Sequence, residues 1–349
     1  MDNQKLIKVL VTGAGSGVGQ SIVKSLRFSR LQIQITSADI NYLNSGLYRA
    51  DKAVLVPKVE SKNALSWYID YLNKKKINIL MIGSEYDVFF FSKNKNIIEK
   101  KTKCIVCVSN EETIKISEDK YLTQKFLKKH KLPYLKTFIP KNVENAIQIA
   151  KKLGFPLILK NRHGTSAKNV FLIEKNKEIY NYFSYMKKPI MQEYAGYQGS
   201  SLDHEYTCSF FTTKEKKIIG PFIARRKLLH GSSWIVEVNN FPKIKTLIKK
   251  ISNYLPNVGS LNVQLRDGPN GPVPFEFNAR FSGTTCIRAN FGFNEPEMFI
   301  RNYFFKRKIN IPKINKGCCF RYLEEIFIKN CNSKSLIKNF SKGTINKWF

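Results

Sequence analysis

The sequence predicts an α/β protein that begins with an open parallel sheet and continues with mixed helices and strands. An apolar run at residues 6–12 leads into a glycine-rich turn and then a helical pattern at 20–28. Strand-like runs and helical patterns, one of them at 64–75, alternate as far as residue 108, which is typical of a parallel sheet covered by helices. In the second half, two alternating apolar runs flank a cluster of turn residues at 267–272. This pattern predicts a β-hairpin with an extended loop.

The first glycine-rich turn resembles a dinucleotide-binding fingerprint. Its glycines are Gly13, Gly15, Gly17 and Gly19, and Asp39 ends the second predicted strand roughly twenty residues further on. A glycine motif alone is weak evidence for a bound dinucleotide. Two interpretations stay open: the NAD(P) site of an oxidoreductase, or a Rossmann-like unit that binds no dinucleotide.

Two carboxylates follow the predicted strand at 77–82. They are Glu85 and Asp87. Ligands of open α/β sheets bind at the carboxyl ends of the strands, so these side chains are candidates for contacting an acceptor substrate. The start of a helix with acidic residues in its first turn explains them equally well.

The predicted hairpin carries polar side chains on one face. A period of two places Glu276, Asn278 and Arg280 together, and a loop centred near Asn270 places Gln264 opposite Glu276. Carboxylate and amide oxygens that leave room for phosphate oxygens are ligands that Mg²⁺ prefers. An ordinary exposed strand face is the alternative interpretation.

These hairpin residues resemble the metal-binding hairpin of ATP-grasp ligases, above all the large subunit of carbamoyl phosphate synthetase. The resemblance implies that Gln264, Glu276 and Asn278 hold Mg²⁺ or Mn²⁺ against the phosphates of ATP. It implies that Arg280 binds the transferred phosphoryl group or an acyl phosphate. It covers most of the chain, from about residue 9 to 302, through four separated motifs in the order of the family.

The same resemblance implies an ATP site built from two lysines and the segments around them. Lys120 lies near the start of a helix for which Ser117 is the predicted cap, and Lys160 ends an apolar strand before a loop at 161–168. The implied cofactor-binding residues are Lys120, Lys160, Gly164, Thr165, Ser166, Gln192, Glu193, Tyr194, Glu205 and His230. The implied catalytic residues are Arg280, Lys160 and Arg288. The loop departs from the family because Gly164 is its one glycine.

The resemblance also implies a domain organisation. A Rossmann-like pre-ATP-grasp domain at 1–112 precedes a two-lobed α+β ATP-grasp domain at 113–306. Within the latter, 113–190 is the lobe that bears the lid and 191–306 is the lobe that binds metal. Residues 307–349 are expected to form a small appendage that packs on the ATP-binding half.

The function that follows is an ATP-dependent carboxylate–amine ligase that forms an amide through an acyl phosphate. Small-molecule carboxylate and amine substrates are expected, with a sugar or an amino acid as the suggested acceptor. A kinase with the same fold and an NAD(P)-dependent oxidoreductase are the alternatives.

Composition restricts the partners and the compartment. The net charge of +33 suggests nucleic acid, but the 59 basic residues are spread along all 349 positions, which favours a compositional bias. No apolar run reaches the roughly 18 residues of a transmembrane helix, so we expect no membrane insertion. Seven cysteines without disulfide spacing favour a reducing cytoplasm. The sequence leaves homo-oligomerisation open.

Overall fold

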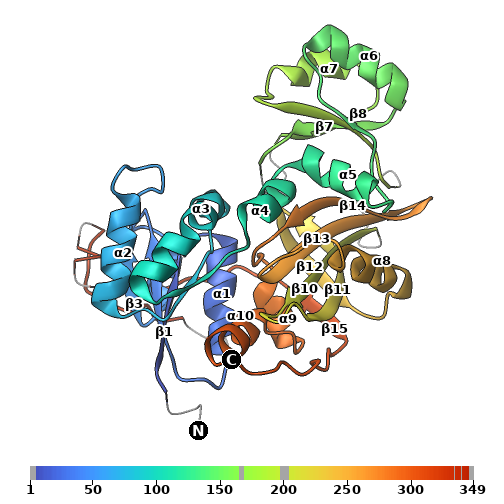
Figure 1. Cartoon of the computed structure of the whole chain (residues 1–349). Coiled ribbons are helices and arrows are strands. Elements are labelled where there is room, and N and C mark those ends of the chain that lie inside the picture. The colour runs from blue at the N-terminus through green and yellow to red at the C-terminus, as the bar shows by residue number, and fades with distance from the viewer. Residues whose placement is uncertain (1–4, 165–168, 197–203, 334, 339, 346–349) are drawn as a thin grey trace.

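Three β-sheets form the framework of the protein in the computed structural model (Figure 1). The structure describes residues 5–164, 169–196, 204–333, 335–338 and 340–345. The first and largest sheets lie together, and the smallest sheet stands away from them in a separate lobe (Figure 1).

The N-terminal sheet has five parallel strands in the order β3-β2-β1-β4-β5. Its strands are β1 (Ile7–Val11), β2 (Ile33–Asp39), β3 (Lys52–Leu55), β4 (Ile79–Met81) and β5 (Ile105–Cys107). Its helices are α1 (Gly17–Arg27), η2 (Ser45–Arg49), α2 (Ala64–Lys75) and α3 (Glu85–Thr102). This is the predicted Rossmann-like unit, and α2 has the predicted bounds. Helix α1 begins before the predicted residue 20 because Ser16 Oγ accepts hydrogen bonds from the amides of Val18 and Gly19.

Two short helices lead out of this unit, α4 (Glu111–Glu118) and α5 (Lys120–Lys129). The prediction that Ser117 caps the helix carrying Lys120 was wrong. Asp119 has an extended backbone between the two helices, and its side chain accepts hydrogen bonds from the amides of Tyr121 and Leu122. The cap places Lys120 at the first residue of α5, where its side chain is 9% exposed.

The small lobe contains an antiparallel sheet in the order β6-β9-β7-β8. Its strands are β6 (Thr137–Phe138), β7 (Leu157–Asn161), β8 (Val170–Ile173) and β9 (Pro189–Glu193), and its helices are α6 (Val143–Leu153) and α7 (Asn176–Phe183). Helix α6 has the predicted bounds because Asn142 caps its start and Gly154, at φ 78°, ends it. Strand β7 carries Lys160 next to β9, which carries Gln192.

The largest sheet has six antiparallel strands in the order β14-β13-β10-β11-β12-β15. They are β10 (Glu205–Thr212), β11 (Ile218–Leu229), β12 (Ser232–Val238), β13 (Gly259–Gly268), β14 (Gly271–Asn278) and β15 (Gly317–Phe320). The accompanying helices are α8 (Pro242–Ser252), α9 (Thr285–Asn290), α10 (Glu295–Phe299) and the π-helical turn η3 (Ile300–Phe304).

The predicted hairpin is β13 followed by β14. Gln264 lies directly opposite Glu276, as predicted. The prediction of an extended loop was wrong, because strand pairing continues to Gly268 and Gly271 and leaves only a two-residue turn of Pro269 and Asn270. Gly271 has a φ of 91°, a conformation that glycine adopts without strain, and this permits the tight reversal.

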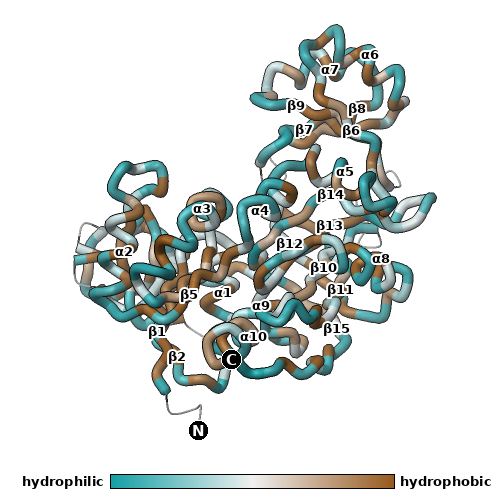
Figure 2. The backbone as a smooth tube through the Cα atoms, in the orientation of Figure 1, coloured by the Kyte–Doolittle hydropathy of each residue, from teal (hydrophilic) through white to brown (hydrophobic). Residues whose placement is uncertain are grey.

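Apolar packing separates the small lobe from the rest. Two hydrophobic clusters each combine residues of the N-terminal sheet with residues of the largest sheet: one contains Leu10, Leu80 and Leu261, and the other contains Val9 and Phe211. A third cluster lies within the small lobe, between residues 146 and 191. Figure 2 shows hydrophobic segments along the strands and hydrophilic segments in the outer loops. The small lobe therefore has its own core, whereas the two larger sheets share theirs.

The segment after residue 307 does more than pack on one half. Strand β15 extends the largest sheet, and the chain then reaches the N-terminal unit, where Glu324 pairs with Arg49 at 3.1 Å and Phe340 stacks on Tyr48. In the described part of the chain, no helix has the length and apolar character needed to cross a membrane.

Candidate active site

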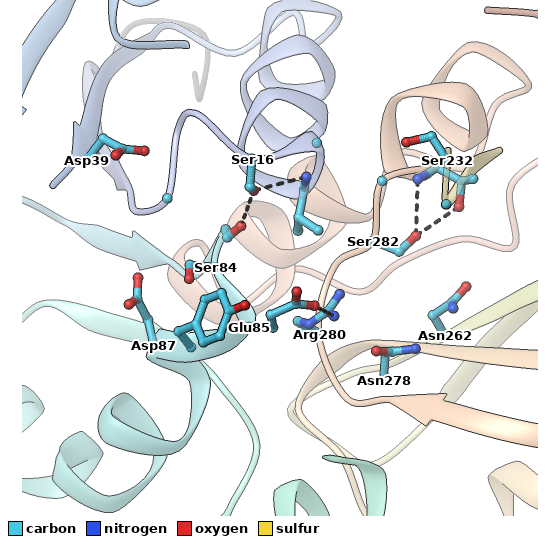
Figure 3. A pocket seen from close by; sticks show the side chains of 18 of the residues that line it. Ser16, Asp39, Ser84, Glu85, Asp87, Ser232, Asn262, Asn278, Arg280 and Ser282 are labelled. Carbon is cyan, nitrogen blue, oxygen red and sulfur yellow. Dashed lines mark hydrogen bonds and ion pairs between the residues drawn. The ribbon is translucent and has the colours of Figure 1, made fainter. Parts of the chain in front are cut away.

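A cavity of about 770 Å³ lies between the carboxyl ends of the parallel sheet and the β13–β14 hairpin (Figure 3). This volume is typical of small-molecule sites, which run from about 300 to 1,000 Å³. Lining residues from the first unit include Ser16, Asp39, Ser84, Glu85 and Asp87, and those from the largest sheet include Asn262, Gln264, Glu276, Asn278 and Arg280. Both predicted acceptor carboxylates therefore face the same space as the hairpin.

The polar face of the hairpin is a connected group around Glu276. Asn278 Nδ2 and Gln264 Nε2 donate to Glu276 Oε1 at 3.1 and 3.4 Å. Gln264 Oε1 accepts from Arg226 Nη2 at 2.8 Å. Arg226 is itself 7% exposed.

These donors can be tested for their fit to a divalent cation. They offer one carboxylate and two amides, and the described residues contain no group of three or more His, Cys, Asp or Glu that could hold a metal. Mg²⁺ commonly uses one or two carboxylates and takes its other oxygens from water and substrate phosphates. Glu276 and Asn278 fit such a cation if Asn278 turns its amide oxygen inward. Gln264 fits less well, because its oxygen already accepts from Arg226.

Arg280 connects the hairpin with the N-terminal unit. Its Nη2 donates to Glu85 Oε2 at 2.6 Å, and its Nη1 donates to the carbonyl oxygen of Phe281 at 3.0 Å. The Arg280 side chain is 8% exposed. The predicted phosphoryl-binding residue is thus held at the cavity, midway between the acids of the first unit and Asn278 (Figure 3).

The two predicted ATP lysines meet the hairpin at Glu276. Lys120 Nζ lies 4.0 Å from Glu276 Oε2 and donates to the carbonyl oxygen of Gly164 at 2.6 Å. Lys160 Nζ donates to Gln192 Oε1 at 2.7 Å. The pKa of Lys160 is lowered to about 7, mainly by burial; the nearby Lys120 adds to the lowering, and Glu276 opposes both effects. An anion bound between these lysines restores the charged form of Lys160.

The remaining predicted ribose-side residues have partners in the protein. Glu193 Oε2 accepts from the amide of Lys136 at 3.2 Å. Glu205 pairs with Arg226 at 2.8 Å and with Arg266 at 3.6 Å, and Arg266 also donates to the Tyr194 hydroxyl at 3.2 Å. Glu205 and Tyr194 therefore meet through Arg266, whereas their contact with a nucleotide stays a prediction.

The prediction that Arg288 acts on the substrate needs correction. Both Arg288 and Glu295 are fully buried, and Arg288 Nη1 donates to the two Glu295 oxygens at 2.9 Å. Its Nη2 donates to Asn262, Ser282 and Thr284. Arg288 therefore does not face the cavity. It binds the far side of the loop whose residues Ser282 and Thr284 line the cavity.

Three other predicted residues have different outcomes. His230 is exposed at the turn between β11 and β12, with φ 48°, while the next residues, 231–233, line the cavity. Its contact with nucleotide stays a prediction. Thr165 and Ser166 lie outside the described residues.

The glycine-rich turn is packed against the protein at Gly15, whereas Gly17 lines the cavity. A Cβ atom at Gly15 would lie 2.3 Å from the side chain of Asn44. The Asp39 carboxylate accepts from the amide of Gly15 at 2.7 Å and from Asn44 Nδ2 at 2.7 Å. Because the acid that would bind a ribose stabilises its own turn, this geometry disfavours the NAD(P) interpretation.

Sequence reasoning missed one carboxyl group beside the site. Burial raises the pKa of Glu118, nearby Glu276 and Glu85 raise it further, and Arg280 and Lys120 lower it. Glu118 Oε1 is buried without a hydrogen-bond partner among the residues that the structure describes. Glu118 ends α4, immediately before Asp119 and Lys120, and only the folded arrangement indicates its place beside Arg280.

Comparison with known families finds two adjoining ATP-grasp segments. The family described as "RimK-like ATP-grasp domain" matches residues 117–203, and "ATP-grasp in the biosynthetic pathway with Ter operon" matches residues 202–326. The alpha-aminoadipate–LysW ligase LysX of Saccharolobus solfataricus is 31% identical over 80 residues, which are 23% of this chain and 29% of that protein. The chain thus matches less than a third of the length of this relative.

Solved structures share the fold over most of the chain. The N5-carboxyaminoimidazole synthetase of Staphylococcus aureus with ADP is 14% identical, with a TM-score of 0.67 and coverage of 86% of this chain and 79% of that one. The biotin carboxylase domain of the Hydrogenobacter thermophilus 2-oxoglutarate carboxylase is 15% identical, with a TM-score of 0.69 and coverage of 89% and 73%. Residues 117–326 match ATP-grasp family models, and the predicted fold class is confirmed.

Proposed function

We propose that this protein is an ATP- and Mg²⁺-dependent carboxylate–amine ligase that forms an amide through an acyl phosphate. One observation carries the proposal: Glu276 lies 4.0 Å from the predicted ATP lysine Lys120 and also lines the cavity. ATP bound at the lysines would therefore present its terminal phosphate to a molecule in the cavity. The match to a ligase, LysX, supports the same reaction class.

The chain's own residues position and neutralise the reactants. Lys120 and Lys160 bind phosphate oxygens, and Lys160 takes up a proton as the phosphates approach, since its pKa of about 7 reflects burial without an anion. Arg280 orients the substrate carboxylate and then holds the acyl phosphate. Glu276 and Asn278 would hold Mg²⁺ or Mn²⁺. The metal would neutralise negative charge on the phosphates.

The chemistry is a pair of displacements. The carboxylate oxygen attacks the γ-phosphorus and ADP leaves. The amine then attacks the acyl carbon, and inorganic phosphate leaves with the bonding electrons. Positioning and charge stabilisation suffice for both steps, so no protein nucleophile is required.

The test is capture of the intermediate with hydroxylamine, which converts an acyl phosphate into a stable hydroxamate. Purified protein, Mg·ATP and a panel of carboxylic, amino and sugar acids are assayed for ADP and for hydroxamate. We expect both products in equal amounts with at least one acid. ADP release that yields a phosphorylated product inert to hydroxylamine would instead show kinase chemistry and overturn the proposal.

A further inference from the structure

The charges of the cavity leave one arginine without a carboxylate partner. Three arginines line it: Arg226, Arg280 and Arg321. Arg226 pairs with Glu205, and Arg280 pairs with Glu85. Within the described ranges, Arg321 has no carboxylate at ion-pair distance, and its Nη2 donates to the carbonyl oxygen of Gly283 at 2.7 Å. A half-buried cation that faces a cavity without a counter-charge is a site for an anionic ligand group.

The C-terminal segment holds Arg321 in place from both directions. Strand β15 pairs with β12 immediately before it, with Val236 opposite Cys319, and the amide of Arg321 donates to the carbonyl oxygen of Trp234 at 2.8 Å. On the other side, Glu324 pairs with Arg49 of the N-terminal unit. Because the backbone is fixed on both sides, the guanidinium is positioned before any ligand binds.

The other end of the cavity has the opposite character. Asp39 and Asp87 lie on the side away from Ser282, next to which Gly283 contacts Arg321 (Figure 3). Glu60 and Lys58, both from the loop after β3, also line the cavity, so that three acids and one lysine are found there. The pKa of Asp87 is raised to about 6, mainly by burial; a hydrogen bond with Thr12 opposes the rise, and the charges of Asp39 and Glu60 add to it. A ligand anion is repelled from that end and attracted to Arg321.

We propose that Arg321 binds a second acidic group of the carboxylate substrate, so that the substrate is a dicarboxylic acid or a carboxylic acid bearing a phosphate. The proposal rests on the ligase function above, in which Arg280 faces the carboxylate that is activated. Arg280 contacts Phe281 and Arg321 contacts Gly283, so the two guanidinium groups hold opposite ends of one short loop. The second acidic group selects the substrate and takes no part in bond making.

The experiment uses matched acids in the hydroxamate assay. L-Glutamate is compared with L-glutamine, and O-phospho-L-serine with L-serine, alongside diacid and monoacid pairs from the same panel. We expect the doubly acidic member of a pair to have a kcat/KM higher by about 10- to 100-fold, the effect of one charge-assisted hydrogen-bond pair. Carboxylate and phosphate pairs distinguish the two sources of the anion.

Variants distinguish a role of Arg321 in binding the substrate from a role in supporting the fold. Arg321→Met is expected to raise the KM of the doubly acidic substrate by about 10- to 100-fold and to leave the KM of ATP unchanged. Arg321→Lys is expected to recover part of that loss. Glu325→Gln changes an exposed acid of the same segment but keeps both Arg321 and the pair between Glu324 and Arg49, and is expected to leave the substrate KM unchanged.

The outcomes distinguish the two proposals. Hydroxamate formation without preference for a second acidic group, or an unchanged KM in Arg321→Met, overturns the role of Arg321 and leaves the ligase function standing. An equal rise in KM in Glu325→Gln and Arg321→Met assigns a structural role to the segment and also overturns it. No hydroxamate from any acid of the panel contradicts the ligase function itself.

Discussion

Replacing Lys160 with methionine is expected to stabilise the protein while removing its activity. The side chain is 5% exposed, and burial lowers its pKa from the ordinary value of 10.5 to about 7. That lowering corresponds to about 5 kcal/mol of unfavourable free energy for the charged form in the folded state. Methionine removes this cost but leaves Gln192 Oε1 without its donor, a loss of about 1–3 kcal/mol. A net gain of about 3 kcal/mol follows.

The gain has a defined pH dependence. Below the folded pKa of about 7 the lysine is charged in both the folded and unfolded states, and its full cost is present. Between pH 7 and 10.5 the folded state loses its proton while the unfolded chain keeps it, so the cost declines as pH rises. Urea unfolding at pH 6.5 and pH 9.5 measures this. We expect the advantage of Lys160→Met to be largest at pH 6.5.

The control is Lys151→Met, which changes an exposed lysine on α6. Its free energy of unfolding is expected to stay within about 0.5 kcal/mol of the unsubstituted protein at both pH values. A Lys160→Met variant that is less stable at both pH values, or equally shifted at both, would refute the buried-cation reasoning. Retained ATP turnover in that variant would refute the role of Lys160 in phosphate binding.

Three further outcomes follow from the same contacts. Arg288→Met leaves Glu295 buried without a cation, and a loss of about 3–5 kcal/mol in urea unfolding is expected, with unchanged affinity for an ATP analogue. Gly15→Ala forces Asn44 aside, and a loss of about 1–3 kcal/mol is expected. Glu276→Gln is expected to abolish hydroxamate formation and to change the unfolding free energy by less than about 1 kcal/mol. Native-like stability of Arg288→Met or Gly15→Ala, or active Glu276→Gln, would contradict the respective assignment.

The hairpin shows what the sequence predicts well. Alternation with a period of two and a cluster of turn residues predicted that Gln264 lies opposite Glu276. The pairing is correct because a register shift between Gln264 and Leu265 compensates for a turn that is shorter than expected. The turn length was wrong, since Gly268 and Gly271 pair and shorten the loop. Local patterns therefore predicted the residues that face the site better than the connection between them.

Residues that depend on distant partners were not predictable in this way. Arg288 follows a Ser/Thr-rich loop that suggests substrate binding, and only its pairing with the buried Glu295 turns it inward. Arg321 comes from a segment without a recognisable motif, and it reaches the cavity because β15 pairs with β12, far away in the sequence. Neither pairing leaves a local pattern in the sequence.

Isothermal titration with a non-hydrolysable ATP analogue, with and without Mg²⁺ and in parallel with NAD⁺, tests the ATP-grasp site most directly. The unsubstituted protein and Glu276→Gln are titrated side by side. We expect binding of the analogue that Mg²⁺ strengthens in the unsubstituted protein and not in Glu276→Gln, and no heat from NAD⁺. Binding of NAD⁺, or analogue binding indifferent to both Mg²⁺ and Glu276, would contradict the proposed site.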